Sequence, residues 1–322
     1  MKALLYQGDK KLSLTQIPEP EGEFIVRVKA CTICGTDLKT YLHGHPNFKP
    51  PCILGHEFIG SVEKAPAGCG YFKGDCVVVA PYGECNKCEN CLHGSKELCN
   101  NKRRISSGAF CELVSIPEDF IEDGVIKLAS ADEVFTLTEP LACVLTAMEK
   151  MNLSENSNVL IAGGGPMGVL FALSLSARNI SVTLSEPIKD RREMAENLGL
   201  KTISPEDAKA KDYDNIVVAV NVPELAELYI NEIADGGTVH LFAGLPAQTK
   251  LSIDASSIHY RGVTIVGSSG FHLSAFHEAY EIISNNKEHF RRLITHRFGI
   301  DEAIKAFETL AAGLAFKVCI MP

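Results

Sequence analysis

The sequence predicts an α/β protein with two domains: a β-rich domain, and a domain built on a doubly wound parallel sheet. The first observation is length, because 322 residues exceed what a single hydrophobic core usually organises. The second is a change near residue 138, from short strands separated by glycine and proline to strands that alternate with helices. Such alternation is typical of βαβ units and a parallel sheet.

The first 140 residues contain short strand patterns with turn residues between them. Residues 24–30 partly alternate between apolar and polar side chains, as a half-buried strand does. Further strands are expected over residues 58–63, 76–79 and 109–114, with glycine and proline between them. This part of the chain therefore reads as an all-β domain.

From about residue 138 the chain alternates between strands and helices. The expected strands are 158–162, 182–184, 216–220, 238–242 and 263–266, and the expected helices are 166–177, 189–198 and 223–233. After residue 290 only a helix (301–310) and a strand (317–320) follow, too little to bury a core. We therefore place this tail on the β domain, which gives a discontinuous domain of 1–140 and 290–322 and a parallel-sheet domain of 141–289.

Composition and charge restrict the function. Apolar residues make up 46% and charged residues 22%, which is ordinary for a globular protein. The 31 Lys and Arg against 40 Asp and Glu give a net charge of −9, so nucleic acid and anionic lipid are poor partners. No apolar run approaches membrane-spanning length, and the chain is already polar at residues 7–9. We expect a cytoplasmic protein.

Four of the twelve cysteines fall close together, at Cys85, Cys88, Cys91 and Cys99. In a reducing compartment such clustering indicates a metal site rather than disulfides. A tetrahedral zinc ion suits four thiolates from one loop, and it would then have no open position for substrate. An iron site of the same ligand type or a nucleic-acid-binding zinc ribbon is chemically feasible, although the net negative charge disfavours the ribbon.

A glycine fingerprint follows the strand at 158–162. Gly163, Gly165 and Gly168 fit the pattern G-x-G-x-x-G, with Pro166 and Met167 inside it. The first glycine permits the tight turn, the second lets backbone approach a pyrophosphate, and the third allows close packing of helix on strand. Glu186 ends the next strand, where an acid accepts hydrogen bonds from the adenosine ribose. The context predicts a dinucleotide site.

Candidates for the chemistry lie in the β domain and at its end. Cys34, His56, Glu57 and Glu139 offer the thiolate, imidazole and carboxylates that a catalytic zinc uses. Taken singly, each also has a plainer interpretation: a small buried thiol, a core histidine, or solvated carboxylates. Sequence separation alone does not decide between these readings.

The whole pattern resembles the zinc-containing medium-chain alcohol dehydrogenases, in particular the polyol (sorbitol-type) and threonine dehydrogenase branch. The resemblance covers essentially the full length. It rests on motifs in this order: Cys34-Gly35-Thr36-Asp37, Gly55-His56-Glu57, Gly74-Asp75-Cys76-Val77, the four-cysteine loop, Glu139-Pro140-Leu141-Ala142, the glycine fingerprint, Leu293-Ile294-Thr295-His296-Arg297-Phe298 and Phe316-Lys317-Val318.

The resemblance implies a chaperonin-10-like β-barrel catalytic domain, a Rossmann domain and an active-site cleft between them. It implies that Cys34 and His56 bind the catalytic zinc, and that Glu57 binds it directly or by exchange. Glu139 occupies the place of a further ligand, direct or through water.

The resemblance also gives roles to residues beside the metal and the cofactor. Asp37 matches a partner of the zinc-bound histidine, Thr36 matches the hydroxyl that begins a proton relay, and Arg191 sits where a guanidinium packs against adenine. Tyr41, His43 and His45 could line the pocket, finish the relay, or be exposed loop residues.

The implied activity is transfer of a hydride from a secondary alcohol, such as a polyol, to NAD, giving a ketone. Zinc (one catalytic, one structural) and NAD are the implied cofactors, with NADP disfavoured by Glu186, and a homodimer or homotetramer is implied. The alternatives are a threonine 3-dehydrogenase or general alcohol or aldehyde dehydrogenase of the same fold, and a non-catalytic nucleotide-binding zinc protein. The chain departs from the family pattern at 60–74 and 100–108, which are short, and at 221–223. In the family these segments line or flank the substrate cleft and the cofactor rim, so the sequence does not identify the substrate.

Overall fold

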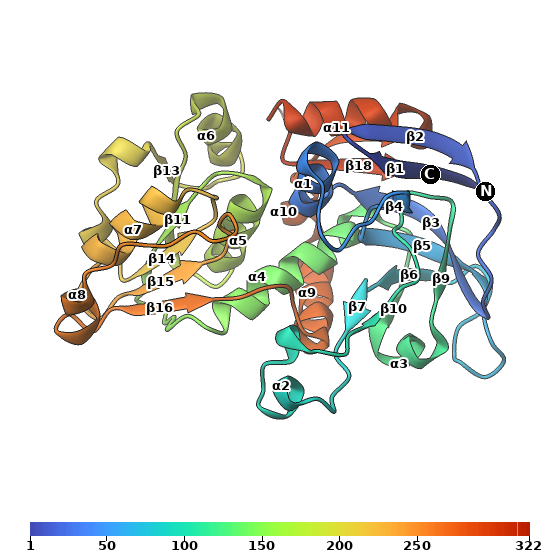
Figure 1. Cartoon of the computed structure of the whole chain (residues 1–322), viewed down its shortest axis with the longest axis horizontal. Helices are drawn as coiled ribbons and strands as arrows, with labels where there is room; N and C mark the ends of the chain where they lie inside the picture. The colour runs from blue at the N-terminus through green and yellow to red at the C-terminus, as the bar shows by residue number, and fades with distance from the viewer. Residues whose placement is uncertain (314) are drawn as a thin grey trace. The chain divides into compact units, whose positions relative to one another are not determined.

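The chain divides into two compact units in the computed structural model, which describes residues 1–313 and 315–322 (Figure 1). Unit 1 contains Met1–Ala142 and Phe271–Pro322, and unit 2 contains Cys143–Gly270. Unit 1 is discontinuous in sequence, as we expected. It also includes residues 271–289, which we had assigned to the parallel-sheet domain.

Unit 1 is built mainly from antiparallel sheets. A three-stranded sheet has the order β2-β1-β4, and a larger sheet has the order β10-β6-β5-β3-β18-β17 with β9 also on β3. Their bounds are β1 Lys2–Gly8, β2 Lys11–Gln16, β3 Phe24–Thr32, β4 Cys52–Ile53, β5 Glu57–Lys64, β6 Cys76–Val79, β9 Leu113–Ile116, β10 Val125–Leu128, β17 Ile294–Gly299 and β18 Lys317–Met321, and a small sheet pairs β7 Tyr82–Gly83 with β8 Arg103–Arg104.

The expected strand at 109–114 is wrong in its first half. The N–H groups of Ala109 and Phe110 donate to the carbonyls of Gly55 and Leu54, at 2.9 and 3.0 Å. This segment therefore pairs with the loop before β5, and β9 begins only at Leu113. The other three strands expected in this region are present, with 76–79 as predicted.

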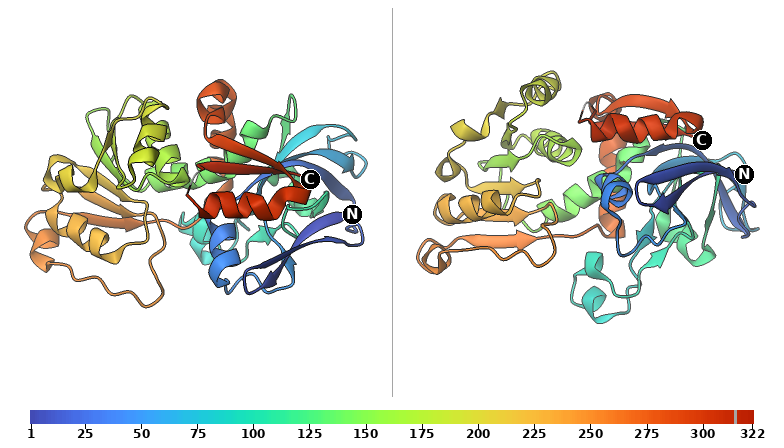
Figure 2. Two further views of the ribbon diagram at one scale, coloured as in Figure 1. Left: turned by 90° about the horizontal axis from the view of Figure 1, so that it is seen from above. Right: turned by 45° about the horizontal axis from the view of Figure 1, so that its top comes forward.

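Helices surround these sheets, and several of them were not expected from the sequence. Their bounds are α1 Gly35–His43, α2 Glu89–Leu92, α3 Ile121–Gly124, α4 Thr138–Met148, α9 Leu273–Asn285, α10 Lys287–Arg291 and α11 Ala303–Ala311. Helix α11 lies along β17 and β18, so the C-terminal segment completes unit 1 (Figure 2).

Helix α9 belongs to unit 1 because its first turn is bonded there. Leu273 donates its N–H to a carboxylate oxygen of Glu84 at 3.0 Å, and the ring of Phe271 stacks on Tyr82 with centroids 4.5 Å apart. These contacts explain why the sequence-based boundary at 289 came too late.

Unit 2 contains one parallel sheet of six strands in the order β13-β12-β11-β14-β15-β16. This is the doubly wound order of dinucleotide-binding domains. The strands are β11 Asn158–Ala162, β12 Ser181–Ser185, β13 Thr202–Ile203, β14 Asn215–Val218, β15 Thr238–Leu241 and β16 Thr264–Gly267; the helices are α5 Pro166–Ser176, α6 Lys189–Glu196, α7 Pro223–Glu232 and α8 Ala255–His259. All five strands expected here are present, and the fold-class prediction is confirmed.

Both faces of this sheet are covered. Leu160 of β11 belongs to a buried cluster with Tyr229 and Ile230 of α7. On the opposite face, Ile161 lies so close to α5 that a Cβ on Gly168 would be 3.3 Å from its side chain. Strands that are apolar on both faces follow from this arrangement. Among the described residues, no helix is both long and apolar enough to cross a membrane.

Candidate active site and metal centres

Cys34, His56 and Glu57 come together in unit 1, with one ligand atom of each within 4.8 Å of the others. Cys34 caps the N-terminus of α1, which follows β3, and Glu57 is the first residue of β5. The pairing of Thr32 with Glu57 joins the end of β3 to the start of β5. Adjacent antiparallel strands thus deliver side chains that are far apart in sequence to one place.

The turn before His56 requires glycine at residue 55. Gly55 has φ of +93°, and a Cβ there would lie 2.9 Å from the ring of Phe110. Any residue with a side chain would have a strained backbone here and would also clash with the ring of Phe110. The glycine therefore sets the direction in which His56 leaves the turn.

Asp37 holds the other members of this group in place. Its Oδ1 accepts the N–H of Gly55 at 3.1 Å and lies 3.3 Å from Nδ1 of His56, while its Oδ2 accepts the N–H of Cys34 at 3.0 Å. An Nδ1–H bonded to a carboxylate leaves Nε2 of His56 free to bind a metal, the usual arrangement around a metal-bound histidine. Burial lowers the pKa of His56, but the charges of Asp37 and the Cys34 thiolate, with hydrogen bonds to both, together raise it well above its usual value.

Glu57 already has strong partners in this structure. The ammonium of Lys317 lies 2.5 and 2.6 Å from its two carboxylate oxygens, and the hydroxyl of Thr32 donates to Oε2. Glu57 is fully buried and Lys317 is 2% exposed. Burial lowers the pKa of Lys317, but Glu57 and then Cys34 act against it, and the pKa is raised overall, so the ammonium stays charged.

Lys317 lies in the motif Phe316-Lys317-Val318, and the family resemblance implies no role for it. The available signal was a single charged residue in an otherwise apolar strand, Phe316-Lys317-Val318-Cys319-Ile320. A lysine that is buried must be paired. Its partner could not be read from the chain because the two residues lie 260 positions apart.

The remaining site residues expected in unit 1 do not join this group. Glu139 is 7% exposed in the first turn of α4, and its charge contributes to the raised pKa of Lys317. Thr36 lies in the first turn of α1, two residues after Cys34. Tyr41 and His43 are at the opposite end of α1, and His45 lies beyond it.

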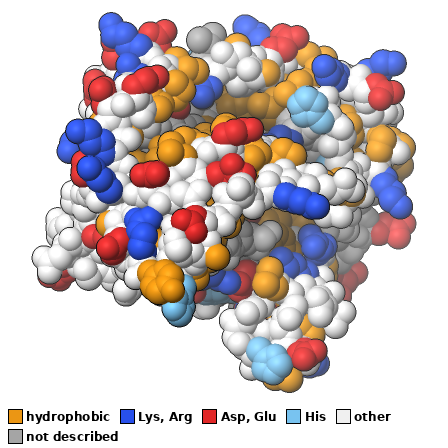
Figure 3. All heavy atoms as spheres, turned by 60° about the vertical axis from the view of Figure 1, so that its left-hand side comes forward, with side chains coloured by type: hydrophobic (Ala, Val, Ile, Leu, Met, Phe, Trp, Pro, Cys, Tyr) orange, Lys and Arg blue, Asp and Glu red, His pale blue; other side chains and the backbone are white. Residues whose placement is uncertain are grey.

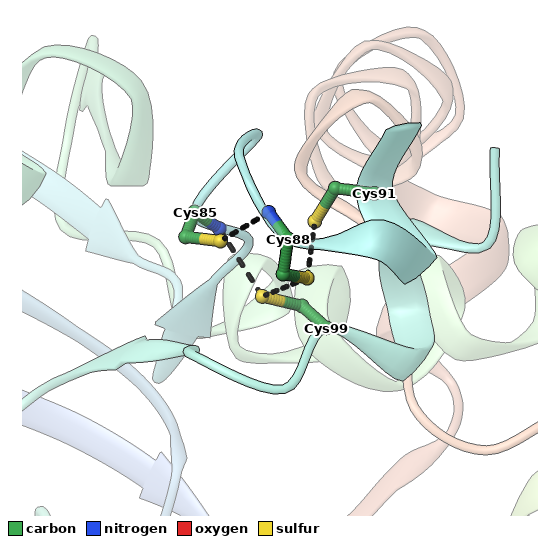
Figure 4. A group of neighbouring side chains, drawn as sticks. All are labelled: Cys85, Cys88, Cys91 and Cys99. Atoms are coloured by element: carbon green, nitrogen blue, oxygen red, sulfur yellow. Dashed lines mark hydrogen bonds between the residues drawn. The ribbon is translucent and has the colours of Figure 1, made fainter. Parts of the chain in front are cut away.

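The four cysteines of the loop 85–99 also meet, with their sulfur atoms within 4.8 Å of one another (Figure 4). Backbone N–H groups point at the sulfurs: Cys88 donates to Cys85 at 3.4 Å, and Asn101 donates to Cys99 at 3.3 Å. The loop, with α2, extends away from the sheets of unit 1 (Figure 1).

The donor chemistry of this loop fits a zinc ion. Backbone hydrogen bonds lower the pKa of Cys85, and they lower that of Cys88 to about 6. Loss of solvation, with neighbouring thiols, raises the pKa of Cys91 to about 12. Four thiolates cannot gather here without a cation, and an ion held by all four would have no open position.

The glycine fingerprint of unit 2 forms the turn between β11 and α5. Gly163 has φ of +114°, and a Cβ on Gly168 would fall 1.9 Å from the carbonyl oxygen of Gly163. Gly165 caps α5, and no atom lies within 4 Å of the position its Cβ would take. A phosphate can therefore approach the N-terminus of α5, with Pro166 and Met167 as its first residues.

Glu186 lies beside this turn and is 3% exposed. Its Oε2 accepts the N–H of Gly164 at 2.8 Å, and its Oε1 accepts the N–H of Ile188 at 2.9 Å. Each oxygen keeps a lone pair for a ribose hydroxyl. Arg191 is partly buried on α6, and Arg192 donates to the backbone carbonyl of Glu186 at 2.7 Å.

Comparison with known proteins shows two family matches. Residues 20–129 match the alcohol dehydrogenase GroES-like domain, and residues 132–317 match the glucose dehydrogenase C-terminus. The chain is 31% identical to D-altritol 5-dehydrogenase of Agrobacterium fabrum over 95% of each chain. The chain belongs to the zinc-type medium-chain alcohol dehydrogenase family.

Two further proteins are similar to this chain. The dehydrogenase is 31% identical to L-threonine 3-dehydrogenase of Pyrococcus abyssi, over 95% of this chain and 93% of that one. Among solved structures it is similar to a protein of Sinorhizobium meliloti assigned as a zinc-binding dehydrogenase and bound to NADP. That match has a TM-score of 0.89 and 28% identity, and it covers 100% of this chain and 99% of the other.

These matches confirm the family and the fold expected from the sequence. The dehydrogenase combines a GroES-like β domain in unit 1 with a Rossmann sheet in unit 2, and it is an enzyme acting on an alcohol. Of the eight predicted metal-binding residues, the structure brings seven into two groups and leaves Glu139 beside one of them.

Proposed function

We propose that this dehydrogenase oxidises a secondary alcohol of a small polyol to a ketone, passes the hydride to NAD, and holds two zinc ions per chain. The observation that carries the proposal is the group Cys34, His56 and Glu57 with Asp37 behind it. A thiolate and an imidazole from this group would hold a zinc ion with room left for substrate, and the four-cysteine loop would hold the second. Zinc bound at the open site supplies Lewis-acid polarisation of the substrate hydroxyl, which lowers its pKa.

The residues of the chain then move the proton and keep the ligands in place. Thr36 lies in the turn that follows Cys34, so we assign to its hydroxyl the first proton transfer from the substrate, which passes the proton on toward solvent. Asp37 keeps the tautomer and the ring orientation of His56. Because Lys317 is paired with Glu57, Glu139 or water would complete the ligand set of a zinc ion held by Cys34 and His56.

The choice of NAD rests on Glu186. The N–H groups of Gly164 and Ile188 hold its carboxylate at the place where the adenosine ribose would bind, and a 2′-phosphate there would meet like charge. The similar structure from Sinorhizobium meliloti bound to NADP is the observation that favours the other cofactor.

The choice of a polyol rests on the similarity to D-altritol 5-dehydrogenase. The second candidate is a threonine 3-dehydrogenase, favoured by the equal identity to the Pyrococcus abyssi enzyme. On the face drawn in Figure 3, acidic and basic side chains are interspersed, so that face gives no support to a nucleic-acid-binding alternative.

Initial rates of NAD reduction with D-altritol, D-sorbitol, L-threonine and ethanol test the proposal. We expect the highest kcat/KM with one of the polyols. A preference for L-threonine over both polyols would replace the first candidate with the second. Loss of all turnover in Cys34→Ser, with the fold retained, would tie the rate to the proposed site.

A further inference from the structure

A hollow lies in unit 1, apart from the metal-binding group. It is a cavity of about 630 Å³, the size of a small-ligand site, between the β1–β2 turn and the segment 41–50. We call it the hairpin pocket. Its lining includes Tyr6, Lys10, His43, His45 and Lys49, and none of Cys34, His56, Glu57 and Lys317.

Helix α1 separates the hairpin pocket from the proposed zinc site. Cys34 caps the N-terminus of the helix, and His43 is its last residue. Nine helical residues at 1.5 Å each span about 13 Å. A ligand in the hairpin pocket would therefore lie at the opposite end of α1 from the proposed zinc site.

The pocket is more basic than the protein around it. The side chains of Lys10 and Lys49 are exposed, and within the part of the chain that the structure describes neither has an ion-pair partner. Asp9 is the single acid of the lining, in a chain whose net charge is −9. Two unpaired ammonium groups facing one hollow raise the local concentration of anions.

Neutral donors complete the lining. The N–H of Asn47 donates to Nδ1 of His45 at 3.2 Å, so the neutral ring carries its proton on Nε2. Tyr6 is 3% exposed, and its hydroxyl makes no hydrogen bond among the described residues. The ring of Phe48 lies beside His45, with centroids 5.2 Å apart, and gives the pocket an apolar wall.

The turn that carries Lys10 has an unusual sequence for its shape. Asp9 and Lys10 have φ of 48° and 58°, and they connect β1 to β2 as a two-residue turn. Hairpin turns with both central residues at positive φ prefer asparagine, aspartate or glycine at the first position and glycine at the second. Asp9 fits this preference, whereas Lys10 occupies a backbone position that glycine would fill with less strain. Such positions often serve a function.

We propose that the hairpin pocket binds the phosphate monoester of a small hydroxylated compound. The ammonium groups of Lys10 and Lys49 recognise the phosphate, and the Nε2–H of His45 and the hydroxyl of Tyr6 donate hydrogen bonds. Charge-assisted hydrogen bonds of this kind are short and strong. The carbon skeleton of the ligand rests on Phe48.

Calorimetric titration of the zinc-loaded protein tests this site without relying on turnover. The probes are sorbitol 6-phosphate, sorbitol and inorganic phosphate. We expect one sorbitol 6-phosphate per chain, bound at least tenfold more tightly than either of the others. Affinity should fall with added salt because the lysines are exposed.

Paired variants separate the pocket from every other site. Lys10→Gln with Lys49→Gln should weaken sorbitol 6-phosphate binding at least tenfold, and Tyr6→Phe should weaken it severalfold. The control, Lys201→Gln with Lys250→Gln, removes the same charge from exposed lysines of unit 2 and should change nothing. Wild-type affinity in the Lys10/Lys49 variant, no saturable binding by the wild type, or equal affinity for inorganic phosphate would each overturn the proposal.

Discussion

The ammonium of Lys317 and the carboxylate of Glu57 form a fully buried ion pair beside the proposed zinc ligands, with N–O distances of 2.5 and 2.6 Å. The pair joins β18, at the end of the chain, to the first residue of β5. A buried pair adds little net stability over apolar side chains of similar volume, but removal of one partner leaves an uncompensated charge. The pair therefore makes Glu57 less available to a metal than its position alone suggests.

Replacement of Lys317 by methionine should destabilise the protein strongly. We expect the free energy of unfolding to fall by about 3–5 kcal/mol, because Glu57 would remain buried without its partner. Urea denaturation of the zinc-loaded protein measures the change. Addition of Glu57→Gln should restore part of the loss, since the second change removes the orphaned charge. A single Lys317→Met variant as stable as the wild type would show that the pair is not held together in solution.

Glu139→Ala should weaken the catalytic zinc or abolish turnover while nucleotide binding stays intact. The reason is that Glu57 is engaged by Lys317, so Glu139 is the other carboxylate near the group that could support the metal. We expect kcat to fall at least tenfold, with less bound metal, as for residues that support a metal site. The control is Glu122→Ala, an exposed acid of α3. Wild-type turnover with full metal in Glu139→Ala would make this residue purely structural.

The sequence predicted those features that depend on local patterns. The four-cysteine loop, the glycine fingerprint and the strands of unit 2 are each contained in a short stretch, so spacing and periodicity were sufficient. Residues 271–289 were assigned to the parallel-sheet domain because their place depends on contacts of Leu273 with Glu84 and of Phe271 with Tyr82, which are far away in sequence. Lys317 was missed as a site residue for the same reason. Long-range pairs carry no signal in a single chain.

Metal analysis should give close to two zinc ions per chain. Chelation under mild conditions should remove the ion of the Cys34 group first, because a four-thiolate site offers no position to an incoming ligand. Activity should then disappear while most of the thermal stability remains. Cys99→Ser should have the opposite effect. It should lower the melting temperature by partly releasing the loop, while the activity remains. A fully active protein with one zinc per chain would contradict the two-site assignment.

Glu186 should control the choice between NAD and NADP. We expect the wild type to prefer NAD by roughly two orders of magnitude, the effect of a like-charge contact of several kcal/mol. Glu186→Gln removes the charge but keeps an oxygen that can accept one of the two backbone hydrogen bonds. The ratio of kcat/KM for NAD to that for NADP should fall at least tenfold in this variant. An unchanged ratio would show that the carboxylate does not face the ribose.

His240 should make the stability of unit 2 sensitive to acid. The side chain is fully buried on β15, and neither ring nitrogen has a hydrogen-bond partner among the residues that the structure describes. Burial, with a smaller contribution from Lys150, lowers its pKa from 6.5 to about 4. The folded protein then holds the neutral ring, while the unfolded chain takes up a proton below pH 6.5. Stability is complete above that pH and is lost progressively down to about pH 4.

The expected loss between pH 7 and pH 5 is about 2 kcal/mol for this one group, at 1.36 kcal/mol for each unit of pKa difference in play. His240→Leu should remove that part of the pH dependence and fill the same apolar space. His259→Leu, at an exposed position of α8, serves as the control. It should leave unchanged the slope, which is the change in the free energy of unfolding between pH 7 and pH 5. The measurement is urea denaturation at both pH values. Equal slopes in the wild type and His240→Leu would mean that the imidazole finds a partner, or water, that stabilises its charged form.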